Sequence, residues 1–284
     1  MSRHGFRVVN VFASSVLSGN ALCVFEDGSA LADEQMQALA LQFNLSETTF
    51  LLPSAVATAR VRIFTPTFEM PFAGHPTLGS AHVVRALRGH AGHEGDALTL
   101  ETNAGVIPVT ARGDVWTLQA KAPAVRPPGS KPEELANMLG VDVSDLGPDA
   151  MWVDTGSEQL VVPLRSPDAV DRCRPDAALL AKHASNSRRD ALAYVWARES
   201  TATVVARFFF LKAGTLVEDP GTGSACANLG GWHVATEAPL PVELTIRQGE
   251  RTGRACRLGL RVDREKRIYV TGNVIPIAAG ELTL

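Results

Sequence analysis

Several features that would place a chain in a functional class at once are missing from this sequence. Its four cysteines stand far apart and form no C-x-x-C pair, which argues against a zinc site and against a disulfide framework. No apolar run approaches the roughly 18–20 residues of a membrane span. The first residues also lack the apolar core of a signal peptide. We therefore expect a reducing, cytoplasmic location and no association with a membrane.

Signals for nucleic acid, nucleotides and metals are also missing. Lysine and arginine are scattered and the net charge is −3, so the sequence has no basic stripe that would predict nucleic-acid binding. Neither glycine-rich turn contains the G-K-[ST] or G-x-G-x-x-G fingerprint of a phosphate or dinucleotide site. His90 and His93 flank glycines in a polar loop without a third nearby ligand, so metal binding is not expected there.

What is present is the composition of an ordinary globular protein, with 45% hydrophobic and 20% charged residues. A length of 284 residues suits two domains, given a rough prior of about 100–200 residues each. The densest Pro/Gly cluster, residues 122–130, predicts the link between them. We expect domains over 1–121 and 130–272, with the last strand, 273–284, returning to the first domain.

Hydrophobic periodicity predicts strands throughout and a few helices. The clearest helix of the first half is 33–43, where Met36, Leu39, Ala40 and Phe43 recur at helical spacing. A second helix is expected over 131–139, with Ser130 as a possible cap. Alternating or apolar runs predict the strands 7–12, 21–25, 47–52, 60–66, 152–156, 159–164, 191–196, 203–211, 242–246, 256–262 and 267–272.

Two similar glycine turns, each followed by a helix of small residues, suggest an internal duplication. The turn 73–77 matches 220–224 in glycine placement and in its closing hydroxyl residue, about half a chain away. The first helix is expected to run on to Gly89, and the second from Ala225 to Gly230, with Gly230 and Gly231 as its exit. The free N–H groups at such a helix start can bind an anion. On these grounds alone the second turn could be an active-site wall, a phosphate cradle or a capped helix.

Four polar side chains near these turns are candidates for chemistry. Glu47 stands where a helix gives way to a strand; it is either a solvated turn residue or a carboxyl group against apolar walls, able to act as acid and base. His75 at a helix start is expected to be neutral, and either satisfies loop carbonyls or transfers a proton. Asp219 is a helix cap or a catalytic group. Ser224 lacks a G-x-S-x-G elbow, and Cys226 reads as a packed core residue.

Three blocks in this order resemble a known family. The stretches 44–50 (NLSETTF), 73–77 (AGHPT) and 218–225 (EDPGTGSA) are similar to the signature blocks of the phenazine-biosynthesis PhzF-like isomerases. Support extends from Val11-Phe12 and Gly19-Asn20 to the last strand, so the resemblance covers essentially the whole chain. Asn10 and Ala21 stand where the family more often has Asp and Pro, and the stretch 249–256 lacks the family's usual Met, Pro and Ser.

The resemblance implies an α+β fold of the diaminopimelate-epimerase type. It has two pseudo-symmetric domains, each a mostly antiparallel barrel-like sheet around a central helix, with the active site in the cleft between them. The family pattern makes Glu47 the acid/base and places His75, Asp219 and Ser224 around the substrate. It implies no metal or organic cofactor, and a homodimer. Ala73-Gly74 and Pro220-Gly221 stand where related racemases carry their two thiols, which disfavours a two-cysteine racemase.

The resulting hypothesis is a cofactor-independent isomerase that transfers a proton on a small carboxylate-bearing substrate. Backbone N–H groups around Gly74 and Gly223, with Ser224, would hold the carboxylate, while His75 and Asp219 would steer protonation. Two alternatives remain open: a non-catalytic protein that binds small anionic metabolites, and an amino-acid racemase or epimerase.

Overall fold

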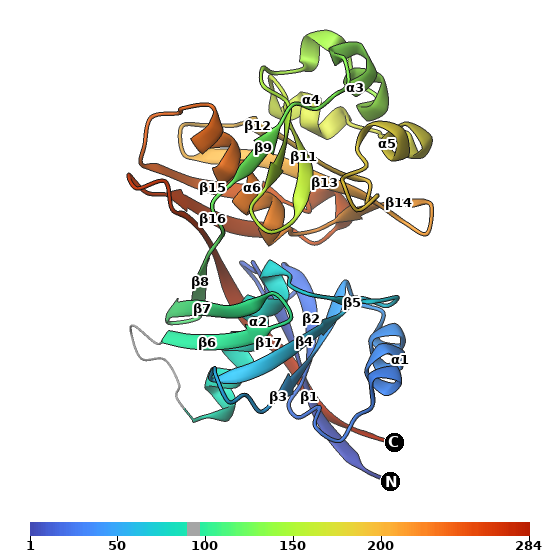
Figure 1. Cartoon of the computed structure of the whole chain (residues 1–284), viewed down its shortest axis with the longest axis vertical. Helices are drawn as coiled ribbons and strands as arrows, with labels where there is room; N and C mark the ends of the chain where they lie inside the picture. The colour runs from blue at the N-terminus through green and yellow to red at the C-terminus, as the bar shows by residue number, and fades with distance from the viewer. Residues whose placement is uncertain (90–96) are drawn as a thin grey trace. The chain divides into compact units, whose positions relative to one another are not determined.

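The protein is described by a computed structural model that covers residues 1–89 and 97–284, so His90 and His93 lie outside the described residues. The chain divides into two compact units, shown in Figure 1. Unit 1 comprises Met1–Gln119 and Thr271–Leu284, and unit 2 comprises Ala120–Val270. Each unit has its own set of paired strands and its own buried helix.

Unit 1 is built on a closed, eight-stranded barrel. Its strands pair in the circular order β1-β2-β3-β4-β6-β7-β8-β17, and β17 returns to pair with β1. The β2–β3 and β4–β6 pairs are parallel. The strands are β1 (Arg3–Val11), β2 (Asn20–Phe25), β3 (Glu47–Leu52), β4 (Ala59–Phe64), the short β5 (Glu69–Met70) beside β4, β6 (Ala97–Thr102), β7 (Gly105–Arg112), β8 (Val115–Gln119) and β17 (Ile268–Thr283).

The helix α2 (Gly74–Leu87) runs inside this barrel, which explains its small residues. Every residue from Gly74 to Arg85 is buried, and the helix contacts β1, β2, β3, β4, β6 and β8. A Cβ atom on Gly79 would lie 2.6 Å from a methyl group of Leu22 and 3.0 Å from one of Val11. Glycine therefore sets the distance at which the helix packs against the barrel wall.

The helix α1 (Asp33–Phe43) covers the outside of the same barrel, as Figure 1 shows. Its buried face, with Met36 and Leu39, packs on β3 and β4 together with a group of aromatic rings. Phe25 and Phe50 stack at 4.8 Å between ring centroids, and Phe64 meets Phe50 edge-on at 5.5 Å. This packing holds β3, and so the residue that begins it, in a rigid setting.

Unit 2 repeats the topology of unit 1. The order of its paired strands is β9-β10-β11-β12-β13-β15-β16, and the parallel pairs β11–β12 and β13–β15 occur at the places of β2–β3 and β4–β6. The sequence-based expectation of two pseudo-symmetric α+β units is confirmed. The strands are β9 (Ala124–Arg126), β10 (Met151–Asp154), β11 (Glu158–Pro163), β12 (Leu192–Arg198), β13 (Thr203–Lys212), β14 (Thr215–Asp219), β15 (Val242–Gln248) and β16 (Cys256–Val262).

The counterpart of α2 in unit 2 is α6 (Gly223–Ala235), which contacts β9, β10, β11 and β16. The predicted exit at Gly230 and Gly231 is wrong, because both lie inside the helix. A Cβ atom on Gly230 would come within 2.7 Å of Ile268, and one on Gly231 within 2.7 Å of Val153. These glycines serve close packing against the surrounding strands rather than termination.

The predicted linker is also more structured than expected. Residues 124–126 form β9, which pairs with β10, so part of the Pro/Gly cluster belongs to the sheet of unit 2. Ser130 is not the cap of α3 (Pro132–Leu139): the N-cap is Lys131, and the Ser130 hydroxyl lies 2.9 Å from Nδ1 of His183.

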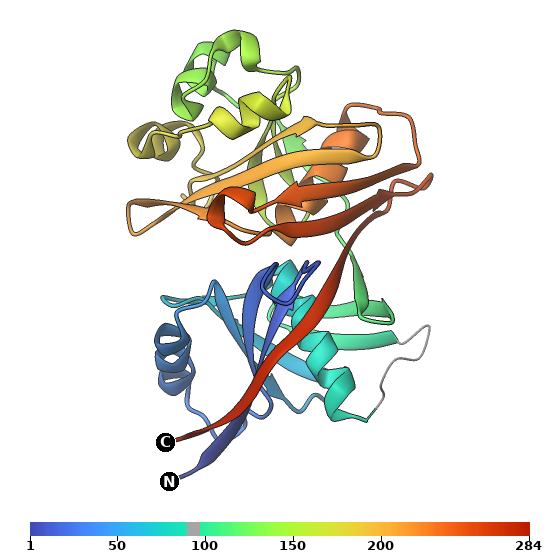
Figure 2. The same cartoon turned by 180° about the vertical axis from the view of Figure 1, so that it is seen from behind.

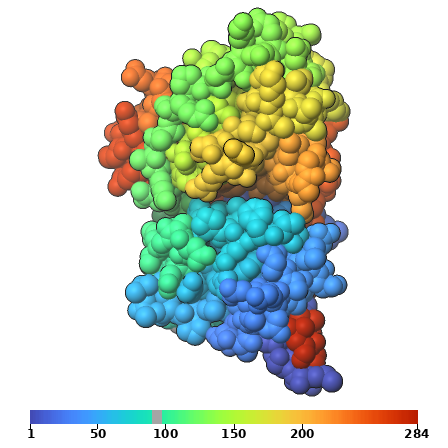
Figure 3. All heavy atoms as spheres, turned by 45° about the vertical axis from the view of Figure 1, so that its right-hand side comes forward, coloured from blue at the N-terminus to red at the C-terminus, as the bar shows by residue number. Residues whose placement is uncertain are grey.

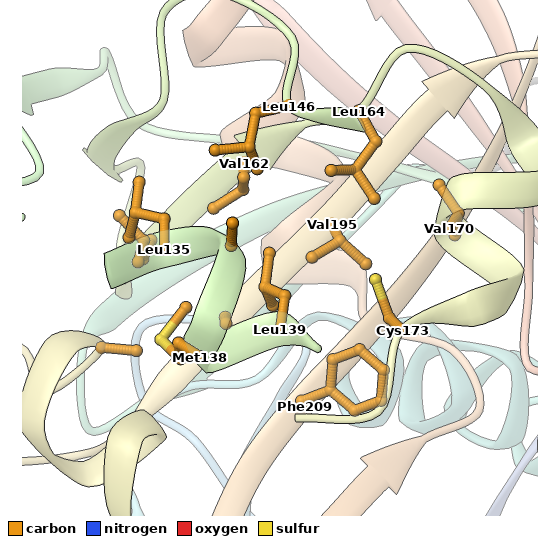
Figure 4. Packing of buried hydrophobic residues seen from close by; sticks show 14 of the residues in the cluster. Leu135, Met138, Leu139, Leu146, Val162, Leu164, Val170, Cys173, Val195 and Phe209 are labelled. Atoms are coloured by element: carbon orange, nitrogen blue, oxygen red, sulfur yellow. The ribbon is translucent and has the colours of Figure 1, made fainter. Parts of the chain in front are cut away.

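Three short helices not all foreseen from the sequence cover the sheet of unit 2. These are α3, α4 (Pro167–Arg172) and α5 (Ala177–His183). Figure 4 shows Leu135, Met138 and Leu139 of α3 packed against residues of the strands, among them Val195 and Phe209. These helices and strands thus share one hydrophobic core in unit 2.

The end of the chain lies beside its beginning. From Ala278 to Thr283, β17 pairs with β1, and Figures 2 and 3 show the two termini next to each other in unit 1. No helix within residues 1–89 and 97–284 is long and apolar enough to cross a bilayer.

The packing inside unit 1 predicts an unusual response to Gly79→Ala. Alanine in place of glycine within an exposed helix gains about 1 kcal/mol, but here the added methyl group would overlap Leu22. We expect the free energy of unfolding to fall by about 1–3 kcal/mol, the usual cost of overpacking. Urea denaturation measures this change. The control is Leu41→Ala, at an exposed position on α1, which should leave the free energy of unfolding nearly unchanged. A stabilising Gly79→Ala would contradict this packing.

Candidate active site

Glu47 is the first residue of β3, and the elements on either side fix its place. Helix α1 ends at Phe43, its C-cap residue Asn44 adopts a left-handed conformation with φ 50°, and the strand begins three residues after Asn44. Because β3 pairs in parallel with β2, Glu47 lies opposite Leu22. Its side chain is only 15% exposed. The sequence therefore located this carboxyl group correctly at a helix-to-strand junction close to buried surface.

His75 is the second residue of α2, and its side chain is 6% exposed. The ring is hydrogen-bonded to the backbone of Ala21. Since Nε2 makes no hydrogen bond to residues 1–89 or 97–284, Nδ1 is the donor to the Ala21 carbonyl. Burial lowers the pKa of His75 to about 3, although the bond to Ala21 acts in the opposite direction. The imidazole is neutral at physiological pH, as its position at a helix start predicted.

These two side chains meet. Nε2 of His75 lies 3.4 Å from Oε2 of Glu47. The contact is not an ion pair, because the low pKa of His75 keeps the ring uncharged. With its proton on Nδ1, the ring presents the lone pair of Nε2 to Glu47. A protonated Glu47 could donate to that lone pair, so the arrangement can accept a proton on the carboxyl group and hold it.

In unit 2, Asp219 lies at the end of β14 in a short loop that leads into α6. The hydroxyl of Thr222 donates to Oδ2 of Asp219, and Nε2 of Gln248 donates both to Thr222 Oγ1 and to the Asp219 carbonyl, each at 2.9 Å. A Cβ atom on Gly249 would lie 2.3 Å from the carbonyl oxygen of Pro220, so only glycine lets the end of β15 approach this loop. Asp219 thus accepts a hydrogen bond within a clamped turn, and the N-cap residue of α6 is Thr222.

Ser224 is the second residue of α6 and is partly buried. Its Oγ accepts a hydrogen bond from Nε2 of Gln159 at 2.9 Å. The neighbouring Glu218 has a structural role: it receives two N–H groups of Arg207, whose guanidinium also donates to carbonyls at the end of α4. The stretch singled out from the sequence therefore contains one scaffold carboxylate, Glu218, and one oriented toward the loop, Asp219.

The structure places the predicted residues in two groups. Glu47, Gly74 and His75 lie together in unit 1, and Asp219, Gly223 and Ser224 lie at the start of α6 in unit 2. Gly74 and Gly223 are each the first residue of a buried helix. Outward-pointing N–H groups at such helix starts, with the positive end of the helix dipole, favour an anion.

Sequence reasoning missed the residues that orient these groups. The carbonyl of Ala21 carries no side-chain signal at all. Gln159 and Asn228 do carry a signal in the sequence, because each is a buried amide next to apolar or small residues. Buried polar side chains are expected to be hydrogen-bonded, so such isolated amides could have been flagged.

The four cysteines are free and buried. Burial raises the pKa of the thiols of Cys23, Cys173 and Cys256 to about 12, and it raises that of Cys226 as well. A buried thiol that remains protonated is a poor nucleophile and a poor base. Cys226, four residues into α6, is a packing residue as the sequence suggested.

The neutral state of His75 predicts a pH dependence of stability. A histidine in the unfolded chain has a pKa near 6.5, whereas that of folded His75 is about 3. Between these values the unfolded state binds a proton that the folded state does not, so the free energy of unfolding falls as the pH drops below about 6.5, by up to roughly 1.4 kcal/mol per pH unit. His82 and His233, whose pKa values burial also lowers, add to the effect.

The contribution of His75 to this pH dependence is measured by urea denaturation at pH 7, 6 and 5. The wild type is compared with His75→Gln, whose amide can still donate to the Ala21 carbonyl. We expect a shallower loss of stability toward pH 5 in the variant. Equal slopes for both proteins would show that His75 is not held neutral.

Comparisons with known proteins agree with this description. The model of the phenazine biosynthesis-like (PhzC-PhzF) protein family matches residues 9–280. An uncharacterized isomerase of Pasteurella multocida is 38% identical over 99% of this chain and 95% of its own length. The trans-2,3-dihydro-3-hydroxyanthranilate isomerase of Pseudomonas aeruginosa is 34% identical over 99% and 100% of the two chains.

Among solved structures, a Bacillus anthracis phenazine biosynthesis protein of the PhzF family superposes with a TM-score of 0.87 at 25% identity, covering both chains completely. The match to the family model spans nearly the whole chain, and both relatives described above are named isomerases. The three sequence blocks, the duplicated fold and these matches together lead to one conclusion: this chain is an isomerase of the phenazine-biosynthesis PhzF-like family.

Proposed function

We propose that the protein is a cofactor-independent isomerase in which Glu47 moves a proton between two carbon atoms of a small carboxylate-bearing substrate. The observation that carries the proposal is the 3.4 Å approach of Glu47 to a neutral, buried His75. A carboxyl group there is shielded from bulk water and faces a lone pair that can accept a hydrogen bond from its protonated form. General acid–base catalysis needs such a group, with both protonation states accessible.

The proposed reaction balances without an external reagent. The ionised Glu47 takes a proton from an activated carbon of the substrate, and the electron pair left behind is delocalised toward the carboxylate-bearing end. Protonated Glu47 is held against Nε2 of His75 and then returns its proton to a different carbon. The product is an isomer of the substrate, and Glu47 is ionised again.

The remaining predicted residues have binding roles in this proposal. The N–H groups at the start of α2, around Gly74, and of α6, around Gly223, would hold negatively charged oxygen atoms of the substrate. Ser224 would donate to the same anion. Asp219, fixed by the hydroxyl of Thr222, would accept from a polar substituent such as an amino or hydroxyl group and so steer where the proton is returned.

The relatives suggest the first substrate to test. Isomerases named for trans-2,3-dihydro-3-hydroxyanthranilate are 32–34% identical to this chain over nearly their whole length. That compound is a cyclic carboxylate with an amino and a hydroxyl group, and so offers a partner for each proposed binding residue. We propose a substrate of this class.

The role of Glu47 is tested by Glu47→Gln, which keeps the size of the side chain and removes its ability to carry the proton. Turnover of trans-2,3-dihydro-3-hydroxyanthranilate, followed by chromatography of the product, should fall by about 10²–10⁴-fold, while the dissociation constant stays within a few-fold of the wild type. Cys226→Ala is the matched control: because burial raises the pKa of this thiol, it should keep turnover near the wild-type value.

Three outcomes would reject the proposal. Near-wild-type turnover by Glu47→Gln would show that Glu47 does not transfer the proton. Saturable binding by the wild type with no isomerisation of any cyclic or amino-acid carboxylate would favour a binding protein. Inversion at an α-carbon, lost in Cys226→Ala, would favour a racemase.

A further inference from the structure

A chain of hydrogen bonds in the interior of unit 2 ends at Ser224. It begins at Thr155, whose backbone N–H and hydroxyl both donate to Oδ1 of Asn228, at 3.0 and 2.7 Å. Nδ2 of Asn228 donates to the carbonyl of Ser157 at 2.8 Å and to Oε1 of Gln159 at 2.9 Å. Nε2 of Gln159 then donates to Oγ of Ser224 at 2.9 Å. Asn228 is completely buried and Gln159 is 2% exposed.

The direction of every bond in this chain is determined by its first member. A backbone N–H can only donate, so the atom of Asn228 that faces Thr155 must be the amide oxygen. The nitrogen of Asn228 then faces Gln159, and it also faces the carbonyl of Ser157, which can only accept. The oxygen of Gln159 is therefore turned toward Asn228, and its nitrogen toward Ser224.

This polarity constrains the hydroxyl of Ser224. A serine hydroxyl has one hydrogen to donate, and the donor from Gln159 occupies one lone pair of Oγ. The hydrogen cannot point back at Gln159, because an N–H group already occupies that direction. Within the described residues, no hydrogen bond uses the Ser224 hydrogen; it is left for a group outside the chain of bonds, and Ser224 is partly exposed.

We infer that Gln159 and Asn228 are positioning residues that make Ser224 an obligate hydrogen-bond donor to a negatively charged oxygen of the substrate. The start of α6, where Ser224 is the second residue, favours the same sign of charge. The inference rests on the proposed function in one respect only: that Ser224 contacts a carboxylate. It adds a specificity rule, because a hydroxyl fixed as a donor favours a carboxylate over a carboxamide that presents its N–H groups.

Gln159→Glu reverses the direction of the hydrogen bond between residue 159 and Ser224, with little change in the shape of the side chain. One oxygen of the introduced carboxylate can still accept from Asn228, but the other accepts from Ser224, so the Ser224 hydrogen is drawn away from the ligand. The probe is anthranilate, a stable aromatic amino carboxylate, and calorimetry measures its dissociation constant at pH 7.5. Four proteins are compared: the wild type, Gln159→Glu, Ser224→Ala and the double variant.

We expect the effects of the two substitutions on the free energy of anthranilate binding to be non-additive. Ser224→Ala should weaken anthranilate binding by about tenfold, the usual scale for a hydrogen bond to a charged group. Gln159→Glu should weaken it by about tenfold more in the presence of Ser224 than in the Ser224→Ala background. Repulsion between the introduced charge and the ligand acts in both backgrounds and cancels in the comparison. A merely structural role for Gln159 would weaken binding equally in both.

Gln159→Met keeps the experiment decisive if the buried carboxylate prevents folding, which circular dichroism would reveal. It removes the donor to Ser224 without adding charge, and we expect about threefold weaker binding when Ser224 is present and no change when it is absent. The inference is overturned if the effects of the Gln159 and Ser224 variants simply multiply, or if the wild type does not bind anthranilate. Because binding alone is measured, the result does not depend on the role of Glu47, whose failure would appear in turnover instead.

Discussion

The enclosure of a helix within a sheet is the constraint on which the rest of the structure depends. Around α2 and α6 the strands leave little room, and Gly79 and Gly230 contact them where any side chain would overlap. A helix surrounded on all sides has no solvent-facing polar side, so small and apolar residues predominate and the few buried polar side chains need partners. The N–H groups in the first turn of such a helix have no partner within the helix, so they are available to bind an anion. The small residues Gly74 and Gly223, which begin the two buried helices, therefore belong to the candidate site.

Burial governs the chemistry that the candidate site can support. Desolvation keeps His75 neutral, and the Ala21 carbonyl selects which nitrogen carries the proton, so a lone pair faces Glu47. In unit 2 the amides of Gln159 and Gln248 determine which way the hydroxyls of Ser224 and Thr222 point. In both units a fixed backbone or amide partner sets the hydrogen-bonding sense of a side chain that could otherwise act as donor or acceptor. Such preorganisation reduces the reorganisation needed when charge moves in a reaction.

Local patterns predicted much of this molecule from sequence. The bounds of α1 follow from hydrophobic periodicity, and the strand that begins at Glu47 follows from the apolar and β-branched residues after it, since both depend on residues close in the chain. The two similar glycine turns predicted the duplicated fold. The full length of α6 was not foreseen, because Gly230 and Gly231 lie against strands distant in sequence. The partners of His75 and Ser224 were missed for the same reason: Ala21 and Gln159 are brought to them only by the pairing of strands, and no residue type marks a backbone carbonyl as functional.

Proton transfer from carbon is the central claim, and a labelled substrate tests it most directly. The measurement uses trans-2,3-dihydro-3-hydroxyanthranilate, the compound for which several relatives are named, with deuterium on both saturated ring carbons, which bear the amino and the hydroxyl group. If Glu47 removes a hydrogen from either carbon during isomerisation, turnover is slower than with the unlabelled compound, and nuclear magnetic resonance finds the deuterium gone from one of the two carbons. Isomerisation at an unchanged rate, with both deuterium atoms still on their original carbons in the product, would contradict proton transfer by Glu47.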